Sequence, residues 1–185
     1  MYLCHQVDSD LMNDRKVRGS VINGYLKFVE KTWGKEGLEK CLSDTKLKGI
    51  ELRDGGKYPN SMLLEVILWI SRNYGMEYVR KAGRHTVKNL GLLAYIVRFT
   101  SIETMLGKAK DAYAETYDFG EVSMKISGKH AIASMKDVSE IPENCEGWIG
   151  ALEALLEITR TKGTVRKTKC QLKGDPRCEY EVIWE

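Results

Sequence analysis

The sequence predicts an α+β fold in which an N-terminal helical half packs on a small antiparallel sheet. Apolar residues recur at helical spacing through most of residues 17–118. After residue 119, two segments alternate apolar and polar side chains around turns, and one helical segment separates them. The predicted order is therefore helices, β-hairpin, helix, β-hairpin. We expect a single domain over residues 1–185, with residues 1–16 as an N-terminal extension, 17–118 as the helical half and 119–185 as the α+β half.

The composition is typical of a soluble globular protein. Of 185 residues, 43% are hydrophobic and 30% are charged, and only three are proline. The net charge of +3 is too small, and the charges too interspersed, to favour nucleic-acid binding. The longest apolar stretches, 62–70 and 90–97, are shorter than the roughly 20 residues that span a bilayer. Residues 1–16 contain no apolar signal segment. We therefore expect a cytoplasmic protein with no membrane span.

Helical segments account for the first half of the chain. Apolar residues from Val17 to Trp33 predict a first helix, and glycines at 34 and 37 predict a break before a short second one. The glycine- and proline-containing residues 48–60 predict a loop. Three further helices are predicted at 62–74, ended by Gly75, at 76–87, and at 90–110 with a kink or break at Ser101.

The second half predicts two hairpins and one helix. Alternation over residues 120–135 around the turn 127–129 predicts the first hairpin. Pro142 and Asn144 introduce a helix at 145–161, which Gly163 closes. Strands at 165–172 and 177–184, joined by the turn 173–176, predict the second hairpin.

Three of the five cysteines group around this second hairpin. Cys170 and Cys178 flank its turn, so strand pairing brings them nearly opposite one another, with Cβ atoms roughly 4.5 to 5.5 Å apart. Cys145, at the start of the preceding helix, can approach the same point. Three interpretations are open: thiolate ligands of a tetrahedral Zn²⁺, buried thiols, or a redox disulfide between Cys170 and Cys178.

The motifs around these cysteines resemble a known family. Cys145-Glu146-Gly147-Trp148-Ile149, Thr168-Lys169-Cys170 and Gly174-Asp175-Pro176-Arg177-Cys178-Glu179-Tyr180 resemble the 4-vinyl-reductase domain, a small-molecule-binding module. The segments 19–42 and 62–110 look like the helical half of the wider haem-NO-binding-like superfamily, which includes vesicle-tethering subunits of related fold. The resemblance covers nearly the whole chain after about residue 17.

The resemblance implies a dimeric ligand-binding domain with a structural zinc site. In related sensors of aromatic compounds, three cysteines that match Cys145, Cys170 and Cys178 bind zinc with a glutamate three residues before the middle cysteine. Here that position is Lys167, and an ammonium cannot ligate zinc. The chain therefore recruits another fourth ligand, with Glu146, Glu143 and His130 as candidates, or lacks the metal.

We do not expect haem from the sequence. Residues 99–106 resemble the segment of haem-binding relatives just before their axial histidine, and the next residues here are Gly107 and Lys108. The Tyr-x-Ser-x-Arg motif that binds the haem propionates in those relatives is also missing. His85 is the histidine nearest to this region.

The expected function is non-enzymatic binding of an apolar or aromatic small molecule, as a sensor or carrier that acts through a partner protein and forms a homodimer. The candidate ligand-binding residues are Trp69, His85, Tyr95, Phe99 and Trp148, because large aromatic side chains line apolar pockets and His85 could meet an anionic group. Two alternatives stay open. An enzyme of tetrapyrrole vinyl reduction would turn over its substrate, although no nicotinamide or flavin fingerprint is present. A tethering scaffold would expose a large apolar face.

Overall fold

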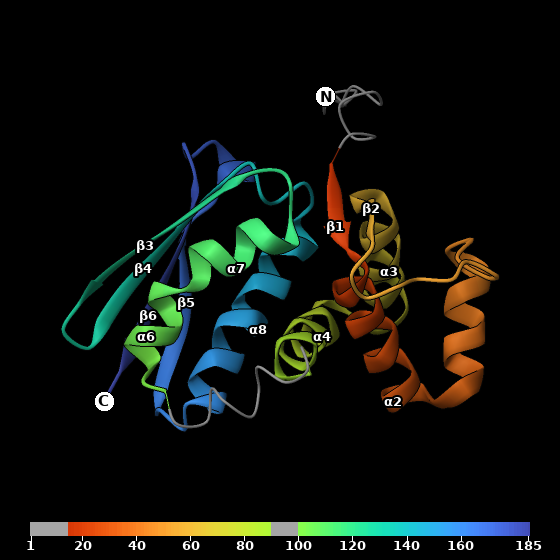
Figure 1. Cartoon of the computed structure of the whole chain (residues 1–185), viewed down its shortest axis with the longest axis horizontal. Helices are drawn as coiled ribbons and strands as arrows, with labels where there is room; N and C mark the ends of the chain where they lie inside the picture. The colour runs from red at the N-terminus through yellow and green to blue at the C-terminus, as the bar shows by residue number, and fades with distance from the viewer. Residues whose placement is uncertain (1–14, 90–99) are drawn as a thin grey trace.

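The computed structural model of the chain describes residues 15–89 and 100–185 and confirms the predicted α+β fold. The helical half contains β1 (Lys16–Arg18), α2 (Gly19–Asp44), β2 (Lys57–Pro59), α3 (Asn60–Tyr74) and α4 (Met76–Lys88). The other half contains α6 (Ile102–Gly107), α7 (Ala109–Thr116), β3 (Glu121–Ser127), β4 (His130–Lys136), α8 (Pro142–Ile158), β5 (Gly163–Lys169), η2 (Gln171–Lys173) and β6 (Cys178–Trp184). Figure 1 shows the two halves side by side, with α4 and α8 at their junction.

Glycines set two boundaries in the helical half, as the sequence predicts. Gly34 has φ +74° and kinks α2 between two helical stretches. Gly75 has φ +97°, a conformation that favours glycine, and separates α3 from α4. β1 and β2 form a short antiparallel ribbon that the sequence analysis did not predict, because three-residue strands carry little alternation.

The predicted helix at 90–110 is confirmed only in part. Residues 90–99 lie outside the described part of the chain. Beyond them, two short helices, α6 and α7, meet at Lys108. The Ser101 side chain accepts a hydrogen bond from the Thr104 backbone at 3.3 Å, so this residue begins α6 as an N-cap.

The four-stranded sheet has the order β3-β4-β6-β5 and is antiparallel throughout. Both predicted hairpins are present. In the second hairpin the pairing shifts between Lys167 and Lys169, and a 3-10 turn follows Cys170. This irregularity ends β5 at Lys169, three residues earlier than the alternation predicts.

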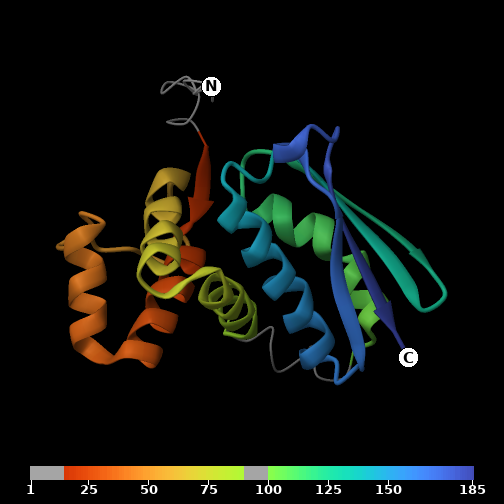
Figure 2. The same ribbon diagram turned by 180° about the vertical axis from the view of Figure 1, so that it is seen from behind.

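α8 lies between α4 and the sheet, as Figures 1 and 2 both show. It begins at Pro142 rather than at Cys145, because the Asn144 side chain accepts hydrogen bonds from the backbone of Glu140 and Ile141 at 3.1 and 3.2 Å. Cys145 therefore lies inside the first turn of the helix.

The junction of α4 and α8 depends on glycine. A Cβ atom at Gly83 would overlap the carbonyl oxygen of Gly147, and one at Gly150 would overlap the carbonyl oxygen of Arg80. The two backbones are therefore in direct contact.

Ion pairs flank this contact. Glu153 accepts hydrogen bonds from Arg80 and Arg84, and Glu157 pairs with Arg84 at 3.2 Å. The junction thus combines close backbone packing with half-buried charge pairs. Each half also has its own hydrophobic core on either side of it.

Among the described residues, no helix is both long and apolar enough to cross a membrane.

Candidate functional site

A cavity of about 540 Å³ lies between the two halves. Residues of α2, α3 and α4 line it on one side, and residues of α6, α7, α8, β3 and β4 line it on the other. Most of the lining side chains are apolar. This volume falls within the range of small-molecule sites, which are mostly apolar clefts with a few polar groups.

Three aromatic side chains form one wall of the cavity. Tyr113 and Tyr117 stack with ring centroids 4.7 Å apart, and Trp148 lies 5.8 and 5.7 Å from them. The Tyr113 hydroxyl donates to the carbonyl oxygen of Phe119 at 2.7 Å. Burial raises the pKa of both phenols, so they remain neutral hydrogen-bonding groups. This wall offers flat apolar surface with neutral polar atoms.

The opposite wall carries a polar group without a partner. Thr86 on α4 is buried, and its hydroxyl has no hydrogen-bond partner among the described residues. It lines the cavity together with Tyr25 of α2, whose phenol pKa is also raised by burial. A buried hydroxyl costs free energy unless it is hydrogen-bonded, so Thr86 is positioned to bond a polar atom of a ligand.

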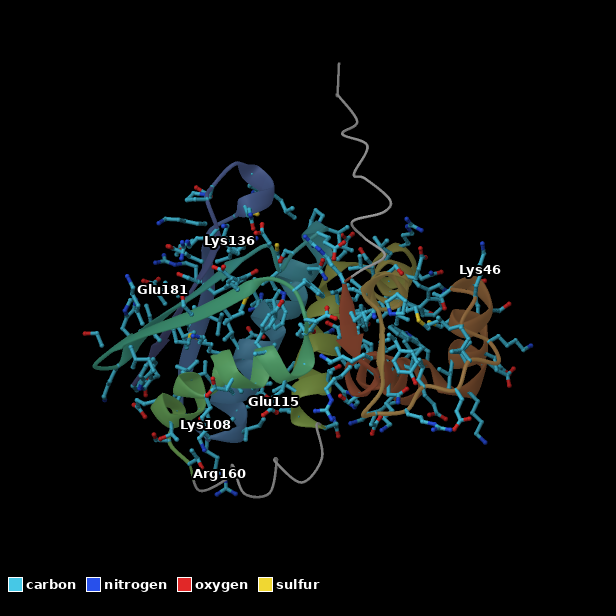
Figure 3. All side chains as sticks on the ribbon, turned by 45° about the horizontal axis from the view of Figure 1, so that its top comes forward. Lys46, Lys108, Glu115, Lys136, Arg160 and Glu181 are labelled. Atoms are coloured by element: carbon cyan, nitrogen blue, oxygen red, sulfur yellow. The ribbon has the colours of Figure 1, made fainter. Side chains whose placement is uncertain are left out.

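Charged side chains occur along the α6 and α7 side of the cavity. Lys108, Asp111 and Glu115 contribute to its lining, and all three are exposed. Figure 3 labels Lys108 and Glu115 along these helices. Lys57 donates to the carbonyl oxygens of Glu115 and Thr116 at 3.3 and 2.9 Å, which ties the end of α7 to the helical half.

The five expected ligand-binding residues are distributed differently from the prediction. Trp148 lines the cavity. Trp69 does not: it is buried in the core of the helical half, where its Nε1 donates to Asp44 Oδ2 at 2.9 Å. His85 is also outside the cavity and packs against Phe28, with ring centroids 5.7 Å apart. Tyr95 and Phe99 lie outside the described residues.

Four further cavity residues are not predicted by the sequence, namely Tyr113, Tyr117, Thr86 and Met105. Tyr113 and Tyr117 carry only the signal of large aromatic side chains, because Tyr117 is the extended C-cap residue of α7 and helical spacing does not bring the two rings together. Thr86 carries none, since its role depends on the junction of α4 with α8.

The three cysteines of the second hairpin meet as predicted. The Sγ atoms of Cys145, Cys170 and Cys178 all lie within 4.8 Å of one another, and all three thiols are free. Cys145 and Cys178 are buried, whereas Cys170 is partly exposed. The helix start of α8 and the turn after β5 position them.

Lys167 takes the place where the sequence analysis looked for a fourth ligand. Its Nζ donates to Cys145 Sγ at 2.6 Å and to Cys170 Sγ at 2.9 Å. Burial acts to raise the pKa of the Cys170 thiol, but the Lys167 hydrogen bond and charge outweigh it and lower the pKa. The pKa of Cys178 is raised by burial. The cluster is thus a set of sulfurs with a cation already in contact.

None of the three candidate fourth ligands joins the cluster. Within the part of the chain that the structure describes, the group able to hold a metal contains only the three cysteines. His130 pairs with Glu181 at 3.0 Å, and Glu143 accepts from Ser71 at 3.2 Å. Glu146 is likewise not in the group. The structure therefore does not place these three residues with the sulfurs, and the alternative that the chain lacks the metal stays open.

Comparisons with known proteins identify the fold. No family model and no curated protein sequence matches the chain. Solved structures do match. An H-NOX protein from S. oneidensis in the Fe(II)NO state is 13% identical, with a TM-score of 0.75 over 91% of this chain and 99% of that one. Fe(II) unliganded H-NOX from K. algicida has a TM-score of 0.68 at 13% identity, covering 91% of this chain and 96% of that one.

An oxygen-binding H-NOX domain related to soluble guanylate cyclases, solved as its oxygen complex, has a TM-score of 0.72. It is 11% identical, and the match covers 91% of this chain and 95% of that one. The chain therefore has the haem-NO-binding-like fold. These comparisons do not extend to the 4-vinyl-reductase domain, which stays a prediction.

The expectation against haem is wrong. The solved structures that share the fold include H-NOX proteins in the Fe(II)NO and Fe(II) unliganded states and an oxygen-binding H-NOX domain, and these neighbours point to haem. The sequence lacks both a histidine after residue 106 and the Tyr-x-Ser-x-Arg motif, but haem iron also accepts methionine and tyrosine as axial ligands. The absence of a histidine at one position therefore does not exclude haem.

Proposed function

We propose that this chain is a small-molecule sensor domain whose cavity binds a flat, mostly apolar ligand of tetrapyrrole size, haem included. The observation that carries the proposal is the cavity of about 540 Å³ between the two halves, with its aromatic wall of Tyr113, Tyr117 and Trp148. A planar ligand gains apolar burial against such rings. Binding rather than turnover is the proposed activity.

The cavity contains residues suited to hold haem. Neither His85 nor His130 lines it, and His5 lies outside the described residues. Met105 of α6 does line it and carries a thioether that binds iron without losing a proton. Tyr113 and Tyr117 would have to ionise to become phenolate ligands, which their burial opposes. Met105 is therefore the proposed axial ligand when haem is bound.

Other lining residues would orient the ligand. The Thr86 hydroxyl, which has no partner among the described residues, would donate to or accept from a polar atom on one face. Lys108 is the cation of the α6 and α7 side and would meet a carboxylate. Haem, when bound, supplies an iron centre that takes up diatomic gases, while these residues position it and exclude water.

Titration with hemin tests the proposal. Purified full-length chain should bind hemin with one site per chain, seen as a shifted Soret band and quenched tryptophan fluorescence. Met105→Leu preserves the volume of the side chain but removes the sulfur, and it should change the Soret spectrum. Met76→Leu is the matched control, because Met76 is exposed and lies outside the cavity.

Metal-free protoporphyrin separates the two parts of the proposal. If it binds equally well to wild type and to Met105→Leu, while the hemin spectrum differs, the cavity and the axial ligand are both supported. An unchanged hemin spectrum in Met105→Leu would remove the axial assignment. Failure of both porphyrins to bind would refute the ligand class. Native mass spectrometry of the same samples reports the bound ligand and tests the expected homodimer.

A further inference from the structure

The cysteine cluster contains a lysine in an unusual position. Lys167 Nζ contacts two sulfurs at once, at 2.6 Å from Cys145 and 2.9 Å from Cys170. It also lies 5.6 Å from the centre of the Tyr180 ring. The amine is therefore positioned by two hydrogen bonds and an aromatic face, on an element separate from the cavity walls.

The contacts of Nζ bear on two other uses of the sulfurs. A disulfide between Cys145 and Cys170 needs an S–S distance of about 2.05 Å, so both sulfurs would have to leave their contact with the amine, whereas these two contacts do not involve Cys178. A zinc ion bound about 2.3 Å from each sulfur would likewise require Lys167 to move away. The contact of Lys167 Nζ with Cys145 and Cys170 is therefore present before any reaction of the cluster.

Cys170 is the entry point for an oxidant. It is the partly exposed member of the cluster, whereas Cys145 and Cys178 are 6% and 1% exposed. Its backbone N–H donates to Asp175 Oδ2 at 2.7 Å, which holds the turn that presents the thiol. Exposed thiols in electropositive surroundings are the ones that peroxides oxidise first.

We propose that hydroperoxide joins Lys167 to Cys170 through one oxygen atom, as an Nζ–O–Sγ bridge, because the amine already lies 2.9 Å from this accessible sulfur. The cluster is then a reversible redox site of the chain. The bridge uses no residue that lines the proposed ligand cavity, so either proposal can fail without the other.

The reaction balances in two steps. In the first, the Cys170 thiol attacks hydrogen peroxide, the O–O bond breaks, and sulfenic acid and water form. In the second, the Lys167 ammonium gives one proton to solvent; the amine and the sulfenic acid then each lose one hydrogen to a second peroxide, which is reduced to two waters while the N–O bond forms. Overall, one thiol, one amine and two peroxides give one bridge and three waters. Two equivalents of a dithiol reductant return the thiol, the amine and one water.

Intact-mass analysis of the full-length chain tests the bridge. After reduction and removal of reductant, a peroxide pulse should add one oxygen and remove two hydrogens, a gain of about 14 Da, whereas a disulfide only loses two hydrogens. Trypsin should not cleave after the modified Lys167, so it should release the peptide 167–169, still joined to the peptide 170–173 by the bridge. Dithiothreitol should restore the original mass and both peptides.

Variants locate the bridge. Lys167→Arg keeps the positive charge but lacks a primary amine, so peroxide should not produce the mass increase in this variant. Lys167→Met should also show no mass increase. Lys169→Met is the matched control, since Lys169 on the same strand pairs with Glu179 at 3.0 Å, and it should behave as wild type. Cys170→Ser should show no mass increase after peroxide, whereas Cys145→Ser should show the same increase as wild type.

Three results would overturn the proposal. One is the same mass gain in both Lys167 variants, and a second is oxidation of wild type only to a disulfide or sulfinic acid. The third is one zinc ion per freshly purified chain together with cysteines that resist peroxide, which would make the cluster a metal site. Circular dichroism of each variant shows whether it is folded, so that the absence of the mass increase is not caused by unfolding.

Discussion

The backbone contact between α4 and α8 gives the sharpest prediction about stability. In Gly83→Ala, the new Cβ would fall well inside 3.0 Å of the Gly147 carbonyl oxygen, a distance that real Cβ atoms essentially never show. A backbone carbonyl cannot rotate away, so the two helices must move apart. Overpacking of this kind costs about 1 to 3 kcal/mol, and we expect the upper end here.

Gly107→Ala is the matched control. Gly107 is helical, and a Cβ there would meet nothing within 4 Å. Both variants gain up to about 1 kcal/mol of helix propensity, so the difference between them isolates the steric cost at Gly83. A difference of about 3 kcal/mol corresponds to roughly 6 to 12 °C in Tm for a chain of this size.

Urea unfolding followed by circular dichroism, together with thermal melts, measures this difference. Gly83→Ala should also weaken ligand binding, because α4 and α8 both line the cavity. If Gly83→Ala unfolds at the same urea concentration as Gly107→Ala, the two helices are not in backbone contact and the described junction is incorrect.

Two further predictions concern charge and hydrogen bonding. Burial acts to raise the pKa of Glu153, but hydrogen bonds from Arg80 and Arg84 outweigh it and lower the pKa. This stabilisation is therefore present above the ordinary carboxyl pKa of about 4.3 and is lost as the pH falls through the lower folded-state value. Glu153→Gln should lower the free energy of unfolding at pH 7, with the deficit shrinking in acid, as urea titrations at several pH values will show. Trp69→Phe removes the hydrogen bond to Asp44, so it should cost about 1 kcal/mol of stability and leave porphyrin affinity unchanged.

Each of these has its own control and its own contrary outcome. Glu77→Gln alters an exposed pair with Lys81, so its stability should change little at any pH. If Glu153→Gln lowers the free energy of unfolding by the same amount at every pH, the charge of the Glu153 carboxylate does not cause the loss of stability. Trp148→Leu, in the cavity wall, should weaken porphyrin binding; if Trp69→Phe weakens it as much, the cavity has been placed wrongly.

The second half of the chain was predictable because its signals are local. Alternation and a glycine turn determine each hairpin, and the positions of Cys170 and Cys178 around one turn determine that their sulfurs meet. Asn144 shows the limit of such reasoning. Its side chain accepts two backbone hydrogen bonds and moves the helix start to Pro142, which the apolar spacing alone does not reveal.

The cavity was less predictable because its walls come from distant elements. An aromatic residue on a helical face indicates burial, but not which of two cores it enters. Trp69 and Trp148 carry the same signal, yet one packs in the helical core and the other lines the cavity. The same ambiguity explains His85, whose ring packs on Phe28 inside one half. Only the junction of the halves decides between these positions.

α8 connects the two proposed sites physically. Cys145 and Trp148 are three residues apart on this helix, so one turn separates the sulfur that contacts Lys167 from the ring that lines the cavity. Gly147, between them, lies against Gly83 of α4, so the two helix backbones are in contact at this point. A ligand that shifted α8 would move Cys145 together with Trp148, because both lie on this helix. Because coupling between two sites is reciprocal, any effect of the bridge on ligand affinity would equal, in free energy, the effect of the ligand on the cluster.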